Sequence, residues 1–325
     1  MKKYLLIYHR EDNDGLISGA LFFYHLTKNL NINKNDIQLM GADYNMLNDL
    51  PDEYIDDLPN KFESVIMTDI SFNNTKRMKK LYDMYNSKFI WCDHHKAIIT
   101  ESFKMKFDMA PGVRDTSKSA ILCAYQYLFD PFNEQYNNGQ ISELLRTLSA
   151  YDSWSYEREN IPFNICRAIN KYITVHTELS FWNALELVEN ELIAPAIEHD
   201  LNRMFDKGME YIKYDQYQSD ELVRNYGDLT WTVGDNQKAC ALFWQGPSNS
   251  RFFETLQDTD IRQGIVFKRL PDTNWVISLY NVNDSEEFDC GKYLKETYKG
   301  GGHKGAAGCT ISEKKFLKIL KAKQI

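Results

Sequence analysis

Aspartate and histidine residues with the chemistry of metal ligands occur at three places in the N-terminal half of this chain. They lie in the segment 9–15, at Asp69, and in the triplet 93–95. Carboxylates combined with imidazoles suit divalent ions of intermediate hardness, and no cysteine stands among them, which argues against structural zinc. An acidic helix start would explain the first segment taken alone, because aspartate favours the first turn of a helix. The three segments together predict a catalytic metal centre.

We expect two metal ions at this centre. Two ions about 3.5–4 Å apart can hold a bridging hydroxide and clamp a phosphoryl group between the attacking and leaving oxygens. Mn²⁺ is favoured by the mixed ligand set, with Mg²⁺, Co²⁺ or Zn²⁺ as alternatives. The predicted ligands are four carboxylates and two imidazoles: His9, Asp12, Asp14, Asp69, His94 and Asp152.

Three residues are predicted to take part in catalysis. Asp69 follows the central strand of the expected sheet, so it is the predicted bridge between the two ions. His95 cannot easily bind the same ion as its neighbour, and we expect it to donate to a phosphate oxygen as charge develops there. Asp93 is predicted to orient one of the imidazoles from behind the metal ligands.

Alternating strands and helices must position these side chains. The apolar runs that predict strands are 4–8, 36–44, 64–68 and 88–92, and the periodic segments that predict helices are 16–30, 75–85, 117–129 and 142–154. Three of the strands end in Asp or His, and the carboxyl ends of parallel strands form the ligand-binding edge of an open sheet. The pattern predicts an α/β fold with a mainly parallel, doubly wound sheet.

The C-terminal part has a different pattern of predicted secondary structure. Helix-forming residues fill 181–226 with one interruption at Pro195, and short β-like runs follow at 229–234, 239–244, 264–269 and 275–280. A chain of 325 residues is also long enough for two cores. We therefore expect an N-terminal catalytic domain over 1–180, a helical connector over 181–227, and a smaller α/β domain with a mixed sheet over 228–325.

Composition excludes several classes of function. The net charge of −8 and the pI near 5.5 argue against sequence-blind binding to long duplex DNA or to an anionic membrane. Six cysteines without C-x-x-C pairing are typical of reduced, packed thiols. No signal peptide core or membrane span is apparent, so we expect a cytoplasmic protein without a membrane partner. A homodimer is compatible with the sequence.

A glycine-rich stretch near the C-terminus is the second candidate site. Consecutive glycines let backbone N–H groups approach an anion closely, while a tight turn before a strand is the simpler explanation. Arg114, in a loop of the N-terminal half, could also meet a phosphate. The predicted substrate-binding residues are Gly300, Gly301, Gly302, His303, Lys304 and Arg114.

These motifs resemble those of the DHH phosphoesterase superfamily. The segment 9–15, Asp69, the triplet 93–95 and Asp152 match its four ordered motifs, and 300–308 looks like the Gly-Gly-His signature of its nucleotide-type C-terminal domain. The compact size resembles the nanoRNase and pAp-phosphatase branch more than full-length RecJ. The resemblance implies two Mn²⁺ ions on the six ligands and His95 on the substrate. One departure is Tyr280, which stands where relatives often carry an arginine.

The predicted function is a metal-dependent phosphoesterase, of the nanoRNase or exonuclease type, that hydrolyses short single-stranded oligonucleotides through a dimetal-activated hydroxide. Phosphatase or phosphodiesterase action on pAp or cyclic dinucleotides is the first alternative. A pyrophosphatase or polyphosphatase and a non-catalytic nucleotide sensor are further alternatives. The glycine-rich stretch counts against the pyrophosphatase, whose C-terminal domain differs, and the full set of predicted ligands counts against the sensor.

Overall fold

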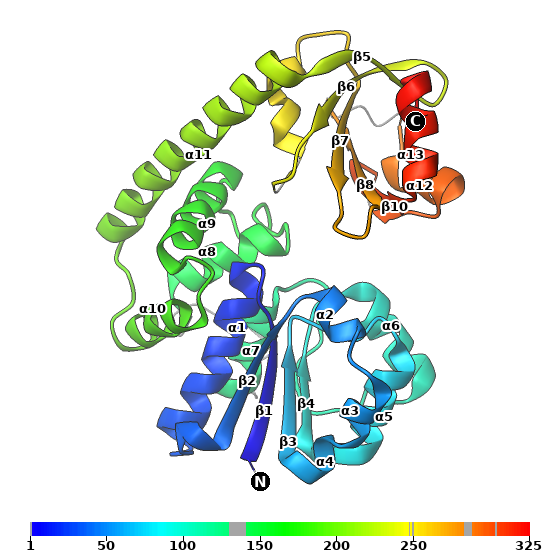
Figure 1. The fold of residues 1–325 in the computed structure, drawn as a ribbon. Helices are drawn as coiled ribbons and strands as arrows, with labels where there is room; N and C mark the ends of the chain where they lie inside the picture. Colours follow the sequence, from blue (N-terminus) through cyan, green and yellow to red (C-terminus); the bar gives the residue numbers. More distant parts are fainter. Residues whose placement is uncertain (1, 130–140, 247, 249, 283–287, 303) are drawn as a thin grey trace. The chain divides into compact units, whose positions relative to one another are not determined.

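The computed structural model describes residues 2–129, 141–246, 248, 250–282, 288–302 and 304–325. The chain forms two compact units, Met1–Tyr211 and Ile212–Ile325 (Figure 1). Among the described residues, every helix is too short or too polar to cross a lipid bilayer.

The first unit is built on a four-stranded sheet in the order β2-β1-β3-β4. Its strands are β1 (Lys2–His9), β2 (Ile37–Ala42), β3 (Phe62–Thr68) and β4 (Phe89–Cys92). Each pair of neighbours runs parallel. The predicted α/β fold with a parallel, doubly wound sheet is confirmed.

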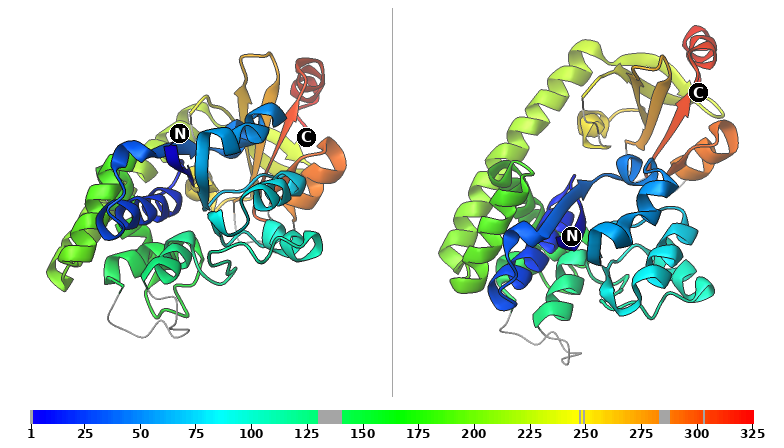
Figure 2. Two further views of the ribbon diagram at one scale, coloured as in Figure 1. Left: turned by 90° about the horizontal axis from the view of Figure 1, so that it is seen from below. Right: turned by 60° about the horizontal axis from the view of Figure 1, so that its bottom comes forward.

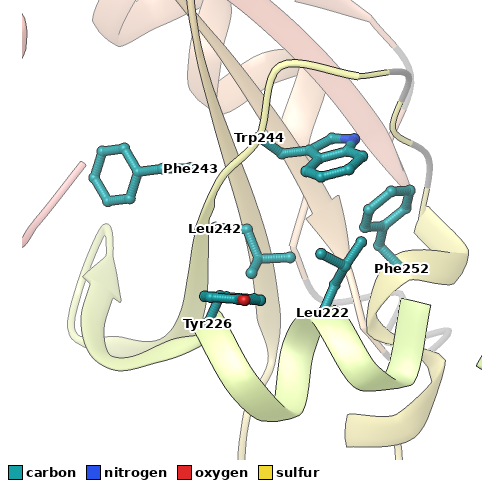
Figure 3. Close-up of a pocket in the computed structure, with 6 residues that line it drawn as sticks. All are labelled: Leu222, Tyr226, Leu242, Phe243, Trp244 and Phe252. Atoms are coloured by element: carbon teal, nitrogen blue, oxygen red, sulfur yellow. The ribbon is translucent and has the colours of Figure 1, made fainter. Parts of the chain in front are cut away.

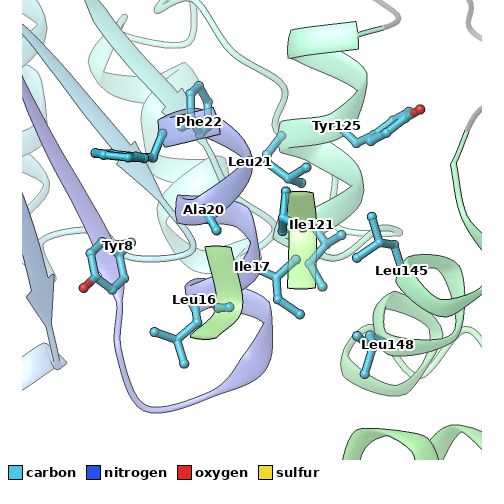
Figure 4. Close-up of a cluster of buried hydrophobic side chains, with 14 of the residues drawn as sticks. Tyr8, Leu16, Ile17, Ala20, Leu21, Phe22, Ile121, Tyr125, Leu145 and Leu148 are labelled. Carbon is cyan, nitrogen blue, oxygen red and sulfur yellow. The ribbon is translucent and has the colours of Figure 1, made fainter. Parts of the chain in front are cut away.

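Alternating side chains of β1 supply the two faces of this sheet, as the period of a strand requires. Leu6 and Tyr8 pack into the core beneath one layer of helices, shown in Figure 4. Leu5 and Ile7 pack into the core on the other face. Because both faces are covered, the strand is continuously apolar from Tyr4 to Tyr8 and does not alternate with polar residues there.

Different helices cover the two faces (Figures 1 and 2). The first face carries α1 (Asn13–Tyr24), α7 (Ala120–Phe129), α8 (Glu143–Asp152), α9 (Phe163–Thr177) and α10 (Phe181–Ile193). The second carries α2 (Tyr44–Asn48), α3 (Asp52–Asp56), α4 (Leu58–Lys61), α5 (Thr75–Tyr85) and α6 (Lys96–Met105). The helices α2, α3, α4, α6 and α9 have no counterpart among the predicted elements.

Several predicted boundaries differ from the observed ones. The helix predicted over 16–30 starts earlier, at Asn13, and gives way to a π-helical turn, His25–Asn29. The helix predicted over 142–154 ends at Asp152. The predicted connector, 181–227, forms α10, which packs against α1, and α11 (Glu198–Tyr226), within which the boundary between the two units falls.

The second unit contains a six-stranded mixed sheet in the order β5-β6-β7-β8-β10-β9. Its strands are β5 (Asp228–Val233), β6 (Gln237–Phe243), β7 (Gln263–Arg269), β8 (Trp275–Asn281), β9 (Gly301–Gly302) and β10 (Ala306–Ile311). The β6–β7 pair is parallel and the other pairs are antiparallel, which confirms the predicted mixed sheet. Helices α12 (Cys290–Tyr298) and α13 (Glu313–Ala322) pack on one face.

A largely apolar pocket of about 510 Å³ lies in the second unit, between the end of α11, the end of β6 and the 3₁₀ helix Ser250–Leu256 (Figure 3). It is lined by Leu222, Tyr226, Leu242, Phe243, Trp244 and Phe252. Among the described residues, none of the predicted site residues lines it.

Candidate metal centre

The order of the strands determines where a ligand can bind on the first sheet. From β1 the chain crosses to β2 on one side, whereas β3 and β4 extend the sheet on the other side. Ligand crevices in open α/β sheets form where the order reverses, outside the carboxyl ends of the strands. His9 ends β1, and Asp69 directly follows β3. The predicted residues therefore lie at the switch point of this sheet.

The turn after β1 depends on a glycine. A Cβ atom at Gly15 would lie 2.2 Å from the carbonyl oxygen of His9, so any larger residue would force the turn apart. The Asp12 carboxylate caps α1 by accepting a hydrogen bond from the Gly15 N–H at 2.9 Å. Its other oxygen lies 3.0 Å from Nδ1 of His9. Asp12 thus combines helix capping with a place in the candidate site.

Asp69 lies between the two histidines that are predicted to bind metal. Its Oδ2 is 3.5 Å from Nδ1 of His9, and its Oδ1 is 3.2 Å from Nε2 of His94. The residue is only 2% exposed and adopts a positive φ of 57°. Aspartate tolerates this conformation better than most residues, and such outliers cluster at functional sites.

Asp14 and Asp152 complete the cluster around His94. Their Oδ2 atoms lie 3.7 Å and 3.4 Å from Nε2 of His94. The Asp14 carboxylate also accepts hydrogen bonds from the N–H groups of Ala120 and Ile121, at 2.7 Å and 2.9 Å. The first turn of α7 therefore holds this carboxylate in place and favours its negative charge.

The six predicted ligands form two groups of three that suit metal ions. One is His9, Asp12 and Asp69, the other is Asp14, His94 and Asp152, and within each group the ligand atoms lie within 4.8 Å of one another. His9 Nε2 is buried without a hydrogen-bond partner, and the buried oxygens Asp69 Oδ1 and Asp152 Oδ2 both approach Nε2 of His94 without forming a well-aligned hydrogen bond. Unpaired buried polar atoms are costly, and coordination to a cation would satisfy them.

The charges of the cluster favour cation binding as well. Burial and the neighbouring carboxylates raise the pKa of Asp14 to about 7 and that of Asp152 to about 9. Burial alone would lower the pKa values of His9 and His94, but hydrogen bonds and attraction to the carboxylates raise both to about 10. Four carboxylates repel one another more than two imidazoles can offset, and divalent cations would relieve this repulsion.

Asp93 holds His95 in a defined orientation. The buried Asp93 carboxylate accepts hydrogen bonds from the backbone N–H groups of His94 and His95 and from the indole N–H of Trp91. Its Oδ1 also lies 2.7 Å from Nδ1 of His95. Although burial alone would raise the pKa of Asp93, these contacts lower it, so the carboxylate is charged and Nδ1 of His95 carries the proton.

Tyr44 is a residue of this site that the sequence analysis missed. Its hydroxyl lies 3.3 Å from Nε2 of His95, and its ring packs 5.6 Å from that of His9. The two groups can bond in either protonation state: the Tyr44 hydroxyl donates to Nε2 of a neutral imidazole, and Nε2 donates to the hydroxyl when the imidazole is protonated. The position of Tyr44 in the sequence could have predicted this, because it comes two residues after the end of β2, at the same edge of the sheet as the other site residues.

The remaining predicted residues are not among the side chains of this cluster, although the backbone of Arg114 pairs with that of Asp93. The Arg114 guanidinium donates to the backbone carbonyls of Trp91, Asp108 and Ala110, so it already stabilises the loop before α7. Gly301 and Gly302 form the edge strand β9 in the second unit, and Lys304 is exposed in the turn that follows. Glycine is required at position 302, because its φ is 144° and a Cβ there would also lie 2.5 Å from Cα of Ala307. His303 lies outside the described residues.

Comparison with known proteins identifies the fold. No family model matches the sequence, and no curated protein matches it significantly. Among solved structures, a DHH domain from a protein described as a member of a family of ribosomal proteins aligns with a TM-score of 0.57 and 16% identity, covering 99% of this chain and 85% of that one. The chain has the DHH-domain fold.

Two further solved structures align with this DHH-fold chain. The pGpG-specific phosphodiesterase PggH from Vibrio cholerae gives a TM-score of 0.51 at 15% identity, covering 99% of this chain and 97% of PggH. RecJ from Thermus thermophilus, in complex with Mn²⁺, gives a TM-score of 0.44 at 13% identity, covering 99% of this chain and 51% of RecJ.

Proposed function

We propose that this protein is a metal-dependent phosphoesterase that hydrolyses short oligonucleotides. The observation that carries the proposal is the pair of ligand groups at the switch point, joined through Asp69. Two bound divalent ions, Mn²⁺ being the preferred pair, would supply a water-derived nucleophile at neutral pH and offset charge on the phosphoryl oxygens. The DHH-domain fold is consistent with this chemistry.

The chain's own residues supply the geometry for this reaction. Asp69 keeps the two ligand groups at a fixed separation, and its burial prevents the carboxylate from swinging away. His95 faces the same cluster with Nδ1 held by Asp93, which leaves Nε2 as the atom that can meet a phosphate oxygen. In its protonated form the imidazolium would stabilise the negative charge that develops there.

The charge of the chain favours a small substrate. Long nucleic acids are held by many phosphate contacts, and this chain carries 46 acidic against 38 basic residues. A short substrate needs few anchors beside the metal centre, and we propose the stretch Gly300–Lys304 as a segment that contacts phosphate. The structurally similar PggH is described as specific for the dinucleotide pGpG, which agrees with a substrate of a few nucleotides.

A substrate screen tests this proposal. Metal-free protein is supplied with Mn²⁺ and offered a length series of 5′-labelled RNA and DNA, pAp, cyclic dinucleotides and pyrophosphate. We expect hydrolysis of dinucleotides to tetranucleotides, loss of turnover in chelator and in Asp69→Asn, and unchanged turnover in Asp83→Asn. Asp83 is the matched control because it is an exposed carboxylate on α5.

Three results would contradict the proposal. Full turnover at zero metal content would remove the metal centre from the mechanism. A kcat/KM that rises steadily beyond about ten nucleotides would point to an exonuclease that tracks long strands. Hydrolysis of pyrophosphate alone would assign the chain to a different reaction.

A further inference from the structure

Trp154 occupies an unusual position beside the metal centre. Helix α8 ends at Asp152, Ser153 is its C-cap, and the Ser155 N–H donates to the carbonyl of Ala150, which closes the helix end. Trp154 is the residue with positive φ, 52°, in this turn, where glycine is usual. A bulky residue with this conformation is strained, and such strain persists mainly at functional sites. The preference of the backbone therefore does not explain a tryptophan here.

Burial does not explain it either. The Trp154 side chain is 71% exposed although it is the largest apolar side chain of this segment. One face of its indole packs on Phe163, with ring centroids 5.8 Å apart and planes inclined by 18°. The Phe163 ring is also nearly parallel to that of Tyr151, at 6.2 Å and 13°. Tyr156 also approaches the indole, with ring centroids 6.3 Å apart and planes inclined by 55°, but an exposed fraction of 71% leaves most of the face opposite Phe163 open to solvent.

We propose that this open face of Trp154 stacks on the base of the nucleotide whose phosphate lies at the metal centre. Trp154 is the second residue after Asp152, so their Cα atoms are at most about 7 Å apart. The base and phosphate of a nucleotide are joined through a single sugar and span a comparable distance. A supported, open aromatic face is the type of platform on which bases stack, and stacking tolerates any base.

The inference rests on the proposed function, and it adds to that function the part of the substrate that the protein recognises. It assigns the nucleobase to Trp154 and the phosphate to the metal centre, both within the first unit. The Phe163 ring is a positioning group, because it supports the indole from behind. Selectivity for nucleotides over inorganic phosphates would then reside beside Asp152.

The test compares a dinucleotide with its abasic analogue, in which hydrogen replaces the base at the nucleotide that is cut. A stacked base contributes about 1–3 kcal/mol, which corresponds to a factor of about 5–150. Trp154→Ala should lower kcat/KM for the dinucleotide by this factor and leave the abasic analogue unchanged. Trp154→Phe should retain most of the activity, because it keeps an aromatic face.

Trp182→Ala is the matched control. Trp182 is 59% exposed and packs on Phe23, nine residues beyond Asp14 on α1 and so about 14 Å further along that helix. It should leave both substrates unaffected. An equal loss on both substrates in Trp154→Ala would overturn the inference in favour of a structural role, and so would no loss on either. If Trp154→Ala does not fold, Trp154→Leu provides the same comparison.

A binding measurement separates this inference from the proposed function. If the wild-type protein hydrolyses neither substrate, the proposed reaction fails, but the stacking still predicts a difference in affinity. Titration calorimetry in Mg²⁺ should show that the wild-type protein binds AMP more tightly than ribose 5-phosphate, and that Trp154→Ala removes this difference. Equal discrimination in both proteins would overturn the stacking.

Discussion

The candidate metal centre of the first unit and the glycine-rich strand of the second unit are built in opposite ways. At this candidate centre, the buried carboxylates of Asp14, Asp69 and Asp93 meet partly buried side chains from other segments, and backbone N–H groups hold Asp12, Asp14 and Asp93 in place. At β9, the exposed residues Gly301 and Gly302 offer backbone without side chains. This contrast indicates that catalytic side chains must be fixed by the core, whereas a short local segment such as β9 is sufficient to contact a phosphate.

The largest effect is expected at the centre of the first unit. Asp69→Asn removes the charge shared by the two ligand groups, so kcat should fall at least about 100-fold. The isosteric amide keeps the packing, and the thermal midpoint of the metal-free protein should not fall. The effect is measured by steady-state kinetics with Mn²⁺ and a dinucleotide, in which Asp69→Asn is compared with the wild-type protein and with the control variant Asp83→Asn. A kcat within about threefold of the wild-type value would contradict the role of Asp69 in the candidate metal centre.

A change in the glycine-rich segment should act on binding instead. If His303 donates to a substrate phosphate, His303→Ala removes a hydrogen bond worth roughly 1–3 kcal/mol and raises KM by about 5–150-fold. We expect kcat to change little, because this segment takes no part in the bond that breaks. Lys314→Ala, which removes an exposed basic residue from α13, is the control. Unchanged KM on every substrate would reduce the glycine-rich segment to a turn.

A smaller effect is expected from the hydroxyl that orients His95. Tyr44→Phe removes only the oxygen that lies 3.3 Å from Nε2 of His95, so kcat should fall about tenfold. A double-mutant cycle with His95→Ala shows whether the hydroxyl acts through the imidazole. In the His95→Ala background, Tyr44→Phe should then have no further effect. Additive losses would mean that Tyr44 acts independently of His95.

The smallest effect concerns stability without metal. In the folded protein the pKa of Asp14 is about 7 and that of Asp152 about 9, against 3.8 in the unfolded chain. Their contribution to stability is complete below pH 3.8 and is lost as the pH rises through these values. The pKa values of His9 and His94, raised from 6.5 to about 10, act in the same direction up to pH 10.

The thermal midpoint of the metal-free protein should therefore fall between pH 5 and pH 9, by at least about 3 °C. Differential scanning calorimetry in chelator measures this shift. Mn²⁺ should raise the midpoint most at the higher pH, because it replaces the protons that the cluster would otherwise hold. The low pKa of Asp93 does not alter the trend, since its contribution changes only below pH 3.8. A midpoint that rises with pH would contradict the charge pattern of the cluster.

Much of the fold followed from local patterns. Apolar runs bounded by polar strand ends predicted β1, β3 and β4 to within two residues, because a buried parallel strand is apolar throughout. The short helices α2, α3 and α4 were not predicted. They are too short for a periodic signal and depend on caps such as Asp43, which accepts from the Met46 N–H.

The sequence by itself determined which residue types could bind metal and that they end neighbouring strands, because both properties belong to short segments. Only the tertiary structure decided which of them meet. The strand order β2-β1-β3-β4 brings His9 beside Asp69, and the packing of α8 brings Asp152 to His94 across 58 residues. The surroundings of Tyr44 and Trp154 were decided in the same way. Their surroundings depend on contacts between distant segments, which no local pattern specifies, since the free energy that selects them comes from burial in the assembled core.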